Sequence, residues 1–357
     1  MYKTLTLPVL LGVLLGCGAH QSSSEPGVAV VPSEVDFRVV FGSCADDDKP
    51  EHPVWAAMLA ADPDLSIMLG DNVYADSRRF TATPSVELMQ AEYAKLAASQ
   101  GFSALRAAAP MLATWDDHDY GLNDGGKEFE FKQQAQRVFA DFWQLAADDP
   151  RRSRAGVYKA EWLEVGARDI QVVLLDTRFF RDEQRTKRVS ISCPVANYET
   201  NPSGSVLGAQ QWQWLEQELA KPADLRLIVS SIQVIPRQHC FEKWANFPAD
   251  RARLLDALAG ANGGKVVVLS GDRHLGEISA LPGTAGSEAL IEVTSSPLSA
   301  RSGFGEGEVN DYRVSADSLR ESQFGVLELN DSQLRLELRD ASGASRFAIT
   351  TTLDSGP

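Results

Sequence analysis

Four short polar runs in this chain contain residue types that bind metal ions, and each follows an apolar stretch. The runs are Gly42-Ser43-Cys44, Gly70-Asp71-Asn72-Val73-Tyr74, Trp115 to Asp124, and Gly271-Asp272-Arg273-His274. Open α/β sheets bind ligands just beyond the carboxyl ends of their strands, where runs of this kind would lie. We therefore expect these loops to meet in one pocket at one sheet edge, with Asp71 as the first candidate metal ligand.

The donor atoms in these runs are of two kinds. Carboxylate and amide oxygens suit hard cations, whereas the Cys44 thiolate and the His274 imidazole suit a transition metal. The mixture predicts a site that holds two different metal ions. Each run alone also has a structural explanation, because an aspartate after a glycine is typical of a turn and a single cysteine usually packs in a core. It is their combination that indicates a functional site.

The elements that would position these loops alternate between apolar runs of strand length and helical patterns. The expected strands are Phe37–Phe41, Leu65–Leu69, Ile170–Leu175, Leu225–Val229 and Val266–Leu269, and the run from Trp115 follows the short stretch Met111–Thr114. The expected helices are His52–Ala61, Glu87–Ala98, Glu128–Leu145, Ala209–Leu219 and Asp250–Ala259. After Ile278 the chain is rich in strand patterns, namely Leu290–Thr294, Gly325–Leu329, Gln333–Leu338 and Arg346–Thr351. We expect these later strands to form a second sheet packed on the first, in a layered α/β sandwich without a glycine-rich nucleotide-binding loop.

Length and composition indicate an ordinary globular protein. Of 357 residues, 44% are hydrophobic and 23% are charged, which allows a large core in one or two domains. The 34 basic and 49 acidic residues give a formal charge of −15, so nucleic acid is not an expected partner.

The N-terminus has the pattern of an export signal. Lys3 precedes the apolar stretch Leu5–Leu15, which is shorter than the roughly 20 residues that a membrane-spanning helix needs. The run Leu14-Leu15-Gly16-Cys17 resembles a bacterial lipoprotein signal, in which Cys17 would be lipidated. An ordinary secretory signal with an incidental cysteine is the alternative. In either case the protein is expected to leave the cytoplasm.

These patterns predict three parts of the chain. Residues 1–17 would be the signal peptide ending at the lipidated cysteine, and residues 18–34, rich in small and polar side chains, a flexible tether. Residues 35–353 would be the folded domain. The expected location is the bacterial periplasm or cell surface, with a lipid anchor in the membrane.

The remaining cysteines have separate expected roles. Cys44 lies in the candidate site, whereas Cys193 and Cys240 could form a disulfide in the oxidising compartment that an exported protein meets. Two separate buried thiols are the alternative, because sequence separation does not show whether the two Cα atoms come close enough.

In six motifs the chain resembles the alkaline phosphatase D (PhoD)-like family of metallophosphatases. Besides the four runs above, the motifs are Asp176-Thr177-Arg178 with Arg181, and Ser230-Ser231-Ile232-Gln233. The resemblance covers the chain from about Val35 to Ser279, and the set of motifs is specific although each one alone is weak. It implies a four-layer α/β/β/α metallophosphatase sandwich that holds iron (Fe3+) and calcium (Ca2+), with zinc (Zn2+) or manganese (Mn2+) as the alternative metals.

By motif position, the resemblance also implies how the iron is held. Asp71 would bridge the two metals, and Cys44 and Tyr74 would bind iron as thiolate and phenolate. His274 would be a further ligand.

The calcium ligands are implied in the same way. Asp272 would hold calcium together with one oxygen ligand from the loop after His118. Asp117 and Asn123 are both candidates for that ligand.

A site of this chemistry would hydrolyse phosphoesters with a metal-activated hydroxide. His118 is the candidate proton donor to the leaving oxygen, with Asp117 or Asp119 as the group that orients its ring. Guanidinium groups match phosphate oxygens, so the candidates for holding substrate are Arg178, Arg181 and Arg273, and Arg178 is also a candidate catalytic residue.

The sequence thus predicts an exported alkaline phosphatase or phosphodiesterase that cleaves phosphomonoesters, phosphodiesters or both. Its substrate would be a small-molecule or lipid phosphoester, and we expect it to act as a monomer. The alternative is a surface lipoprotein that binds calcium or a phosphorylated ligand without hydrolysis. His118 argues against this alternative, because a binding protein needs no proton donor.

Overall fold

The computed structural model describes residues 35–46, 48–49, 51–76, 84–190, 193, 196–283, 288–300, 308–330 and 332–353. The chain divides into two units, Met1–Ser33 and Glu34–Pro357, and every described residue belongs to the second unit. The expected signal peptide (1–17) with its Cys17 and the expected tether (18–34) lie outside the described residues. Within the described part of the chain, no helix has both the length and the apolar character that crossing a bilayer requires.

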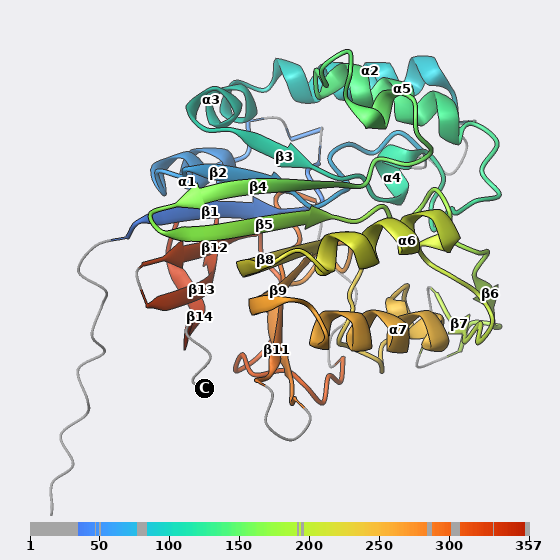
Figure 1. Ribbon diagram of the computed structural model, residues 1–357. Helices are drawn as coiled ribbons and strands as arrows, with labels where there is room; N and C mark the ends of the chain where they lie inside the picture. Colours follow the sequence, from blue (N-terminus) through green and yellow to red (C-terminus); the bar gives the residue numbers. More distant parts are fainter. Residues whose placement is uncertain are drawn as a thin grey trace, which may run out of the picture. The chain divides into compact units, whose positions relative to one another are not determined.

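Two six-stranded sheets form the framework of the second unit (Figure 1). The first sheet contains β14 (Ser345–Thr352), β13 (Gln333–Asp340), β12 (Gln323–Leu329), β1 (Phe37–Gly42), β2 (Leu65–Met68) and β3 (Met111–Ala113), in that order. The second contains β10 (Glu277–Leu281), β11 (Leu290–Thr294), β9 (Gly263–Ser270), β8 (Ala223–Ser230), β5 (Arg168–Leu174) and β4 (Lys159–Val165). A short antiparallel pair is formed by β6 (Arg185–Thr186) and β7 (Tyr198–Glu199).

Each sheet combines parallel strands with antiparallel additions. In the first sheet β1, β2 and β3 are parallel, while β12, β13 and β14 pair in antiparallel fashion beyond β1. In the second sheet β5, β8, β9 and β11 are parallel, and β4 and β10 are antiparallel edge strands. The carboxyl ends of the parallel strands therefore share one edge in each sheet, where ligand-binding loops are expected.

The expectation that the strands after Ile278 form a sheet of their own is wrong. β10 and β11 extend the second sheet, and β12 to β14 extend the first. The physical reason is that β2 covers only one side of β1, and an uncovered side would present a row of unpaired backbone groups. β12 covers that side, with Phe37 opposite Leu329 and Phe41 opposite Gly325.

Helices pack against both sheets. The helices are α1 (Val54–Ala60), α2 (Val86–Ala98), α3 (Gln100–Ala108), α4 (Asp117–Tyr120), α5 (Lys132–Phe142), α6 (Gly208–Leu219) and α7 (Pro248–Ala259), with short 3₁₀ turns η1 (Pro150–Arg152) and η2 (Trp244–Asn246). One apolar core joins α1, α2, α3 and α5 to the first sheet, and another joins α6 and α7 to the second (Figure 1). A third core lies between the two sheets.

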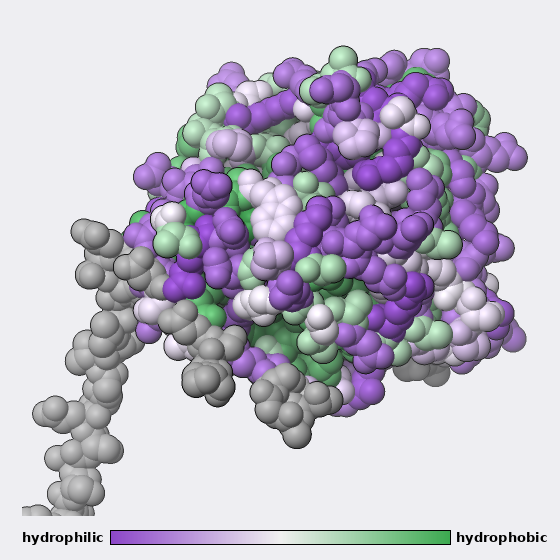
Figure 2. Space-filling model, in the orientation of Figure 1, coloured by the Kyte–Doolittle hydropathy of each residue, from purple (hydrophilic) through white to green (hydrophobic). Residues whose placement is uncertain are grey.

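Residues of β1 show why the strand sequences are almost continuously apolar. Val39 and Phe41 belong to the core shared by the sheets, whereas Val40 belongs to the core under the helices. A strand buried on both faces needs apolar residues at every position. The mixed α/β fold expected from the sequence is thus confirmed, and the visible face of the protein is largely hydrophilic, as Figure 2 shows.

Candidate metal centre

Loops from both sheets converge on the candidate site. The first sheet supplies the loops after β1, β2 and β3, and the second supplies the loop after β9. The expectation that all four loops come from the edge of a single sheet is therefore wrong. Two facing sheets bring their carboxyl edges together, and the backbone N–H of Ser43 after β1 donates to the carbonyl of Ser295 after β11 at 3.1 Å.

Candidate ligands in these loops have backbone in the left-handed region. The φ angle is 60° at Cys44, 48° at Asp71, 64° at Asp272 and 49° at His274. This conformation costs about 1–2 kcal/mol for a residue with a side chain. Such costs cluster at functional sites, where the surrounding structure enforces them. Gly70, which directly precedes Asp71, has a φ angle of 114°. A Cβ atom added at Gly70 would lie 2.6 Å from the Cβ atom of Asp116.

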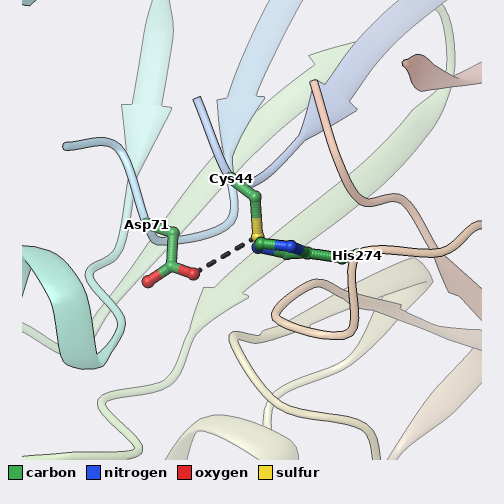
Figure 3. A group of neighbouring side chains, drawn as sticks. All are labelled: Cys44, Asp71 and His274. Atoms are coloured by element: carbon green, nitrogen blue, oxygen red, sulfur yellow. Dashed lines mark hydrogen bonds between the residues drawn. The ribbon is translucent and has the colours of Figure 1, made fainter. Parts of the chain in front are cut away.

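Among the residues that the structure describes, three overlapping groups of side chains could hold metal ions, and within each group the ligand atoms lie within 4.8 Å of one another. The groups are Cys44, Asp71 and His274; Asp71, Asp117 and His118; and Asp71, Asp116, Asp117 and Asp272. Figure 3 shows the first group, with the side chains directed toward one another and Asp71 Oδ2 3.3 Å from the Cys44 sulfur. Asp71 belongs to all three groups, which is the position that a bridging ligand would occupy.

Tyr74 borders the group that contains the thiol. Its hydroxyl lies 3.0 Å from Nε2 of His274. Burial raises the pKa of Cys44 to about 12 and raises the pKa of Tyr74 well above its usual value. The protein alone thus disfavours the thiolate and phenolate forms, and a bound cation would stabilise both of them.

The carboxylates also fit a cation. Asp116 Oδ2 and Asp117 Oδ1 are buried and have no hydrogen-bond partner among the described residues. Burial above all, with neighbouring carboxylates, raises the pKa of Asp71 and Asp272 well above its usual range and that of Asp116 to about 6. Buried oxygens without partners are rare in native proteins, and a positive ion would satisfy these and relieve the repulsion.

The structure separates the two candidates for the calcium ligand. Asp117 belongs to the group of four carboxylates, whereas Asn123 is exposed and donates through its amide to Asp124 Oδ2 at 2.8 Å. The geometry favours Asp117. Asp116 joins the same group, although it was not among the ligands predicted from the sequence. Its residue type was visible in the acidic run, but the direction of its side chain was not.

His118 has a partner, Asp76, that was not predicted from the sequence. Its Nδ1 atom lies 2.8 Å from Oδ1 of Asp76. Burial lowers the pKa of the imidazole, but the carboxylates of Asp117 and Asp76 outweigh this and raise the pKa of His118 to about 10. Asp119 instead accepts the backbone N–H of Asp116 at 2.5 Å. The only signal for Asp76 in the sequence is its position two residues after Tyr74.

Arg178 and Arg181 are completely buried. Arg178 donates through Nε to Asp116 Oδ1 at 2.6 Å and through Nη1 to Glu242 Oε2 at 2.5 Å. Arg181 Nε lies 3.2 Å from the other oxygen of Glu242. These carboxylates indicate a positioning role for both arginines. Among the described residues, Arg178 Nη2 and Arg181 Nε have no hydrogen-bond partner, so the phosphate contact expected from the sequence stays a prediction.

Arg273 and the cysteine pair lie in neighbouring loops. Arg273 is 4% exposed and forms an ion pair with Glu308 at 2.5 Å. Cys193 and Cys240 form a disulfide with their Cα atoms 5.7 Å apart.

Comparisons with known proteins find relatives of this chain. The family model of PhoD-like phosphatases matches residues 39–339. Alkaline phosphatase D of Bacillus subtilis (strain 168) is 24% identical over 299 residues, which cover 72% of this chain and 48% of that protein. The chain thus spans about half the length of this curated relative.

Solved structures share the fold. The structure of PhoD superposes with a TM-score of 0.70 at 19% identity, covering 89% of this chain and 70% of that one. GAP50, the anchor in the inner membrane complex of Plasmodium, superposes with a TM-score of 0.53 at 11% identity, covering 89% and 90% of the two chains. At these identities the likeness shows the fold alone, because one fold can serve unrelated functions.

Proposed function

The chain belongs to the PhoD-like phosphatase family, and from this premise we propose that it is a metal-dependent phosphohydrolase that cleaves phosphomonoesters, phosphodiesters or both. The observation that carries this proposal is the position of Asp71 in all three ligand groups, beside buried carboxylate oxygens that lack hydrogen-bond partners among the described residues. The metal ions of two-metal hydrolases lie about 3.5–4 Å apart, so one carboxylate that belongs to two sets of donors could contact both.

Iron(III) is the proposed metal on the sulfur side. Cys44, Tyr74 and His274 would hold it, because thiolate, phenolate and imidazole suit a transition metal. The buried carboxylate oxygens without partners among the described residues support a bound cation but do not identify the metal, so zinc or manganese is the alternative.

Calcium is the proposed metal on the carboxylate side. Asp116, Asp117 and Asp272 would hold it with Asp71, because carboxylate oxygens are the ligands that calcium prefers. Arg178 donates to Oδ1 of Asp116, which leaves Oδ2, an oxygen without a hydrogen-bond partner among the described residues, available to a cation.

When bound, the two metal ions would lower the pKa of a water molecule and neutralise charge on the phosphoryl oxygens. His118 would donate a proton to the leaving oxygen. Asp76 holds Nδ1 of this ring, which leaves Nε2 for the substrate. The ring of Tyr74 lies against the same imidazole, with 4.3 Å between centroids, and limits its rotation.

The frame proposed for this site is the four-layer α/β/β/α sandwich over residues 35–353. Support comes from the three apolar cores, one on the helix side of each sheet and one between the sheets. A monomer is the proposed state in solution.

Export and lipid anchoring are proposed from residues 1–17 alone. In a bacterial host, the full chain should fractionate with the membrane, and Cys17→Ala should release the folded domain into the soluble fraction or block its maturation. A Cys17→Ala variant that stays on the membrane like the unchanged chain would contradict the anchor.

The function is tested on purified protein from its native host. Elemental analysis gives the metals, and p-nitrophenyl phosphate and bis(p-nitrophenyl) phosphate report monoesterase and diesterase activity. Asp71→Asn is the test variant. It keeps the size of the side chain but removes the charge that both metals would share, so it should lose both the bound metal and the turnover of both esters. If metal-loaded protein binds phosphate but leaves both esters intact, the ligand-binding lipoprotein replaces the enzyme.

A further inference from the structure

Three nitrogen-bearing side chains lie beside the candidate metal centre. Burial, together with the nearby charges of Arg273 and Lys243, lowers the pKa of one of them, His239, well below its usual value. His239 and Lys243 lie in the loop between β8 and η2, and Arg273 lies between Asp272 and His274 after β9. Phe241 joins two of them. The guanidinium carbon of Arg273 is 4.1 Å from the centroid of the Phe241 ring, and Lys243 Nζ donates to the Phe241 carbonyl at 2.8 Å.

All three side chains are more than nine-tenths buried, and each has unused hydrogen-bonding capacity. The exposed fractions are 7% for His239, 5% for Lys243 and 4% for Arg273. Within the described residues, both ring nitrogens of His239 and Nε of Arg273 have no hydrogen-bond partner. The Lys243 ammonium donates to a carbonyl, and no carboxylate of the described residues lies within ion-pair distance of it.

Burial lowers the pKa of Lys243 to about 8, because it outweighs Glu308, Glu242 and Asp272, which act on the ammonium only from beyond ion-pair distance. Burial of an ammonium without a direct ion-pair partner is unfavourable, and native proteins rarely leave buried polar groups without partners. Lysine and arginine only donate hydrogen bonds, and imidazole can donate as well. The partner that would complete this cluster is therefore an acceptor with negative charge. Glu308 takes up only part of the positive charge, because it pairs with Nη2 of Arg273.

The loop that carries the cluster is held in place by the fold. Cys240 directly follows His239 and is bonded to Cys193, which lies 47 residues earlier in the chain. On the other side, Lys243 adjoins the buried Glu242 that pairs with Arg178. A cluster fixed in this way loses little entropy when it binds a ligand, which favours a binding site over an incidental gathering of charges.

We propose that His239, Lys243 and Arg273 form a subsite for a second anionic group, carried by the alcohol part of the phosphoester substrate. The metal centre would take the phosphoryl group that is cleaved, and the subsite would take a phosphate or carboxylate of the same molecule. This inference rests on the phosphohydrolase function proposed above and adds the class of substrate. It also assigns Arg273 to the second anion, not to the phosphate that is cleaved.

Two matched pairs of substrates test the subsite. Glycerol 3-phosphate and 3-phosphoglycerate differ by a carboxylate, and fructose 6-phosphate and fructose 1,6-bisphosphate differ by a second phosphate. The measured quantity is the ratio of kcat/KM within each pair. The unchanged protein should prefer the more anionic member of at least one pair by about tenfold or more, as expected from a charge-assisted hydrogen bond. The pair that shows the preference identifies the anion.

Variants at Lys243 connect this preference to the cluster. Lys243→Met should reduce the ratio about tenfold, and Lys243→Arg should retain most of it because the charge remains. Lys221→Met is the matched control, since the Lys221 side chain is half exposed and pairs with Glu218 near the end of α6, and its ratio should equal that of the unchanged protein. If Lys243→Met shows no cooperative melting transition, His239→Gln takes its place.

Two results would overturn the subsite. One is hydrolysis of p-nitrophenyl phosphate without a preference in either pair, which leaves the proposed function standing and removes the subsite alone. The other is a preference that survives in both Lys243→Met and His239→Gln. If the metal-loaded protein hydrolyses no ester at all, the proposed function fails, and the subsite fails with it.

Discussion

Asp76→Asn isolates the contribution of one carboxylate to proton donation. In the unchanged protein, Nδ1 of His118 lies 2.8 Å from Oδ1 of Asp76. The exchange keeps a side-chain oxygen near Nδ1 and removes only the negative charge. A hydrogen bond to a charged partner contributes about 1.5–3 kcal/mol. Because about 1.36 kcal/mol corresponds to a factor of ten in rate, the step in which His118 donates a proton should slow about 10- to 150-fold.

The assay compares esters whose leaving groups differ in basicity. Nitrophenolate leaves readily as an anion, so hydrolysis of p-nitrophenyl phosphate should change little in the Asp76→Asn variant. Phenyl phosphate should be affected more, and an alkyl phosphate should show the full loss, because an alkoxide needs the proton most. His118→Asn is the reference variant. In its background, Asp76→Asn should slow alkyl phosphate hydrolysis less than about twofold further, because the two residues act as one unit.

Two outcomes would refute this reasoning. If Asp76→Asn slows all three esters equally, the carboxylate supports the fold of the site and not the proton donor. If the effects of Asp76→Asn and His118→Asn multiply in the double variant, the two side chains act independently. Thermal melting of each variant shows whether the fold is intact.

Three further changes probe the iron ligand, the site turn and a buried ion pair. Tyr74→Phe should abolish the visible phenolate-to-iron charge-transfer band of iron-loaded protein, and an unchanged absorption spectrum would exclude Tyr74 as an iron ligand. Gly70→Ala should weaken metal binding about tenfold in calorimetric titrations, because φ is 114° there and the added Cβ would lie 2.6 Å from that of Asp116; equal affinity would mean that the turn adapts. Asp149→Asn should destabilise the fold by about 3 kcal/mol at pH 7, because it breaks a pair with Arg151 in which both side chains are 6% exposed. Burial raises the pKa of Asp149, but Arg151 outweighs this and holds it below its usual value, so the paired carboxylate stabilises the fold above about pH 4 and this contribution is lost as the pH falls further. Urea unfolding of both proteins should show a difference at pH 7 that shrinks at pH 3, and a difference of the same size at both values would contradict the assignment.

The pattern of apolar residues predicted the elements better than their grouping. β1 and β2 lie where apolar runs were expected, because both faces of these strands are buried and their residues, apart from Arg38 and Ser66, lack polar side chains. The strand β4 was not expected. Its side chains are partly or fully exposed, so its sequence lacks the apolar signal. The predicted grouping of strands into sheets was wrong. β12 pairs with β1 although the two strands lie almost 300 residues apart in the chain, with Phe37 opposite Leu329, and local sequence patterns do not show such a pairing.

The sequence by itself determined which donor atoms the protein could offer and in what order. Cys44, Asp71 and His274 could be selected because side-chain chemistry and the position after an apolar run are local properties. Only the tertiary structure decided which of these atoms meet. It placed Asp71 in every ligand group, gave His118 its partner Asp76, and buried the arginines that the sequence had assigned to phosphate. These outcomes arise from contacts between distant segments, 62 residues apart for Arg178 and Asp116, and they form only when two sheets pack with their carboxyl edges together.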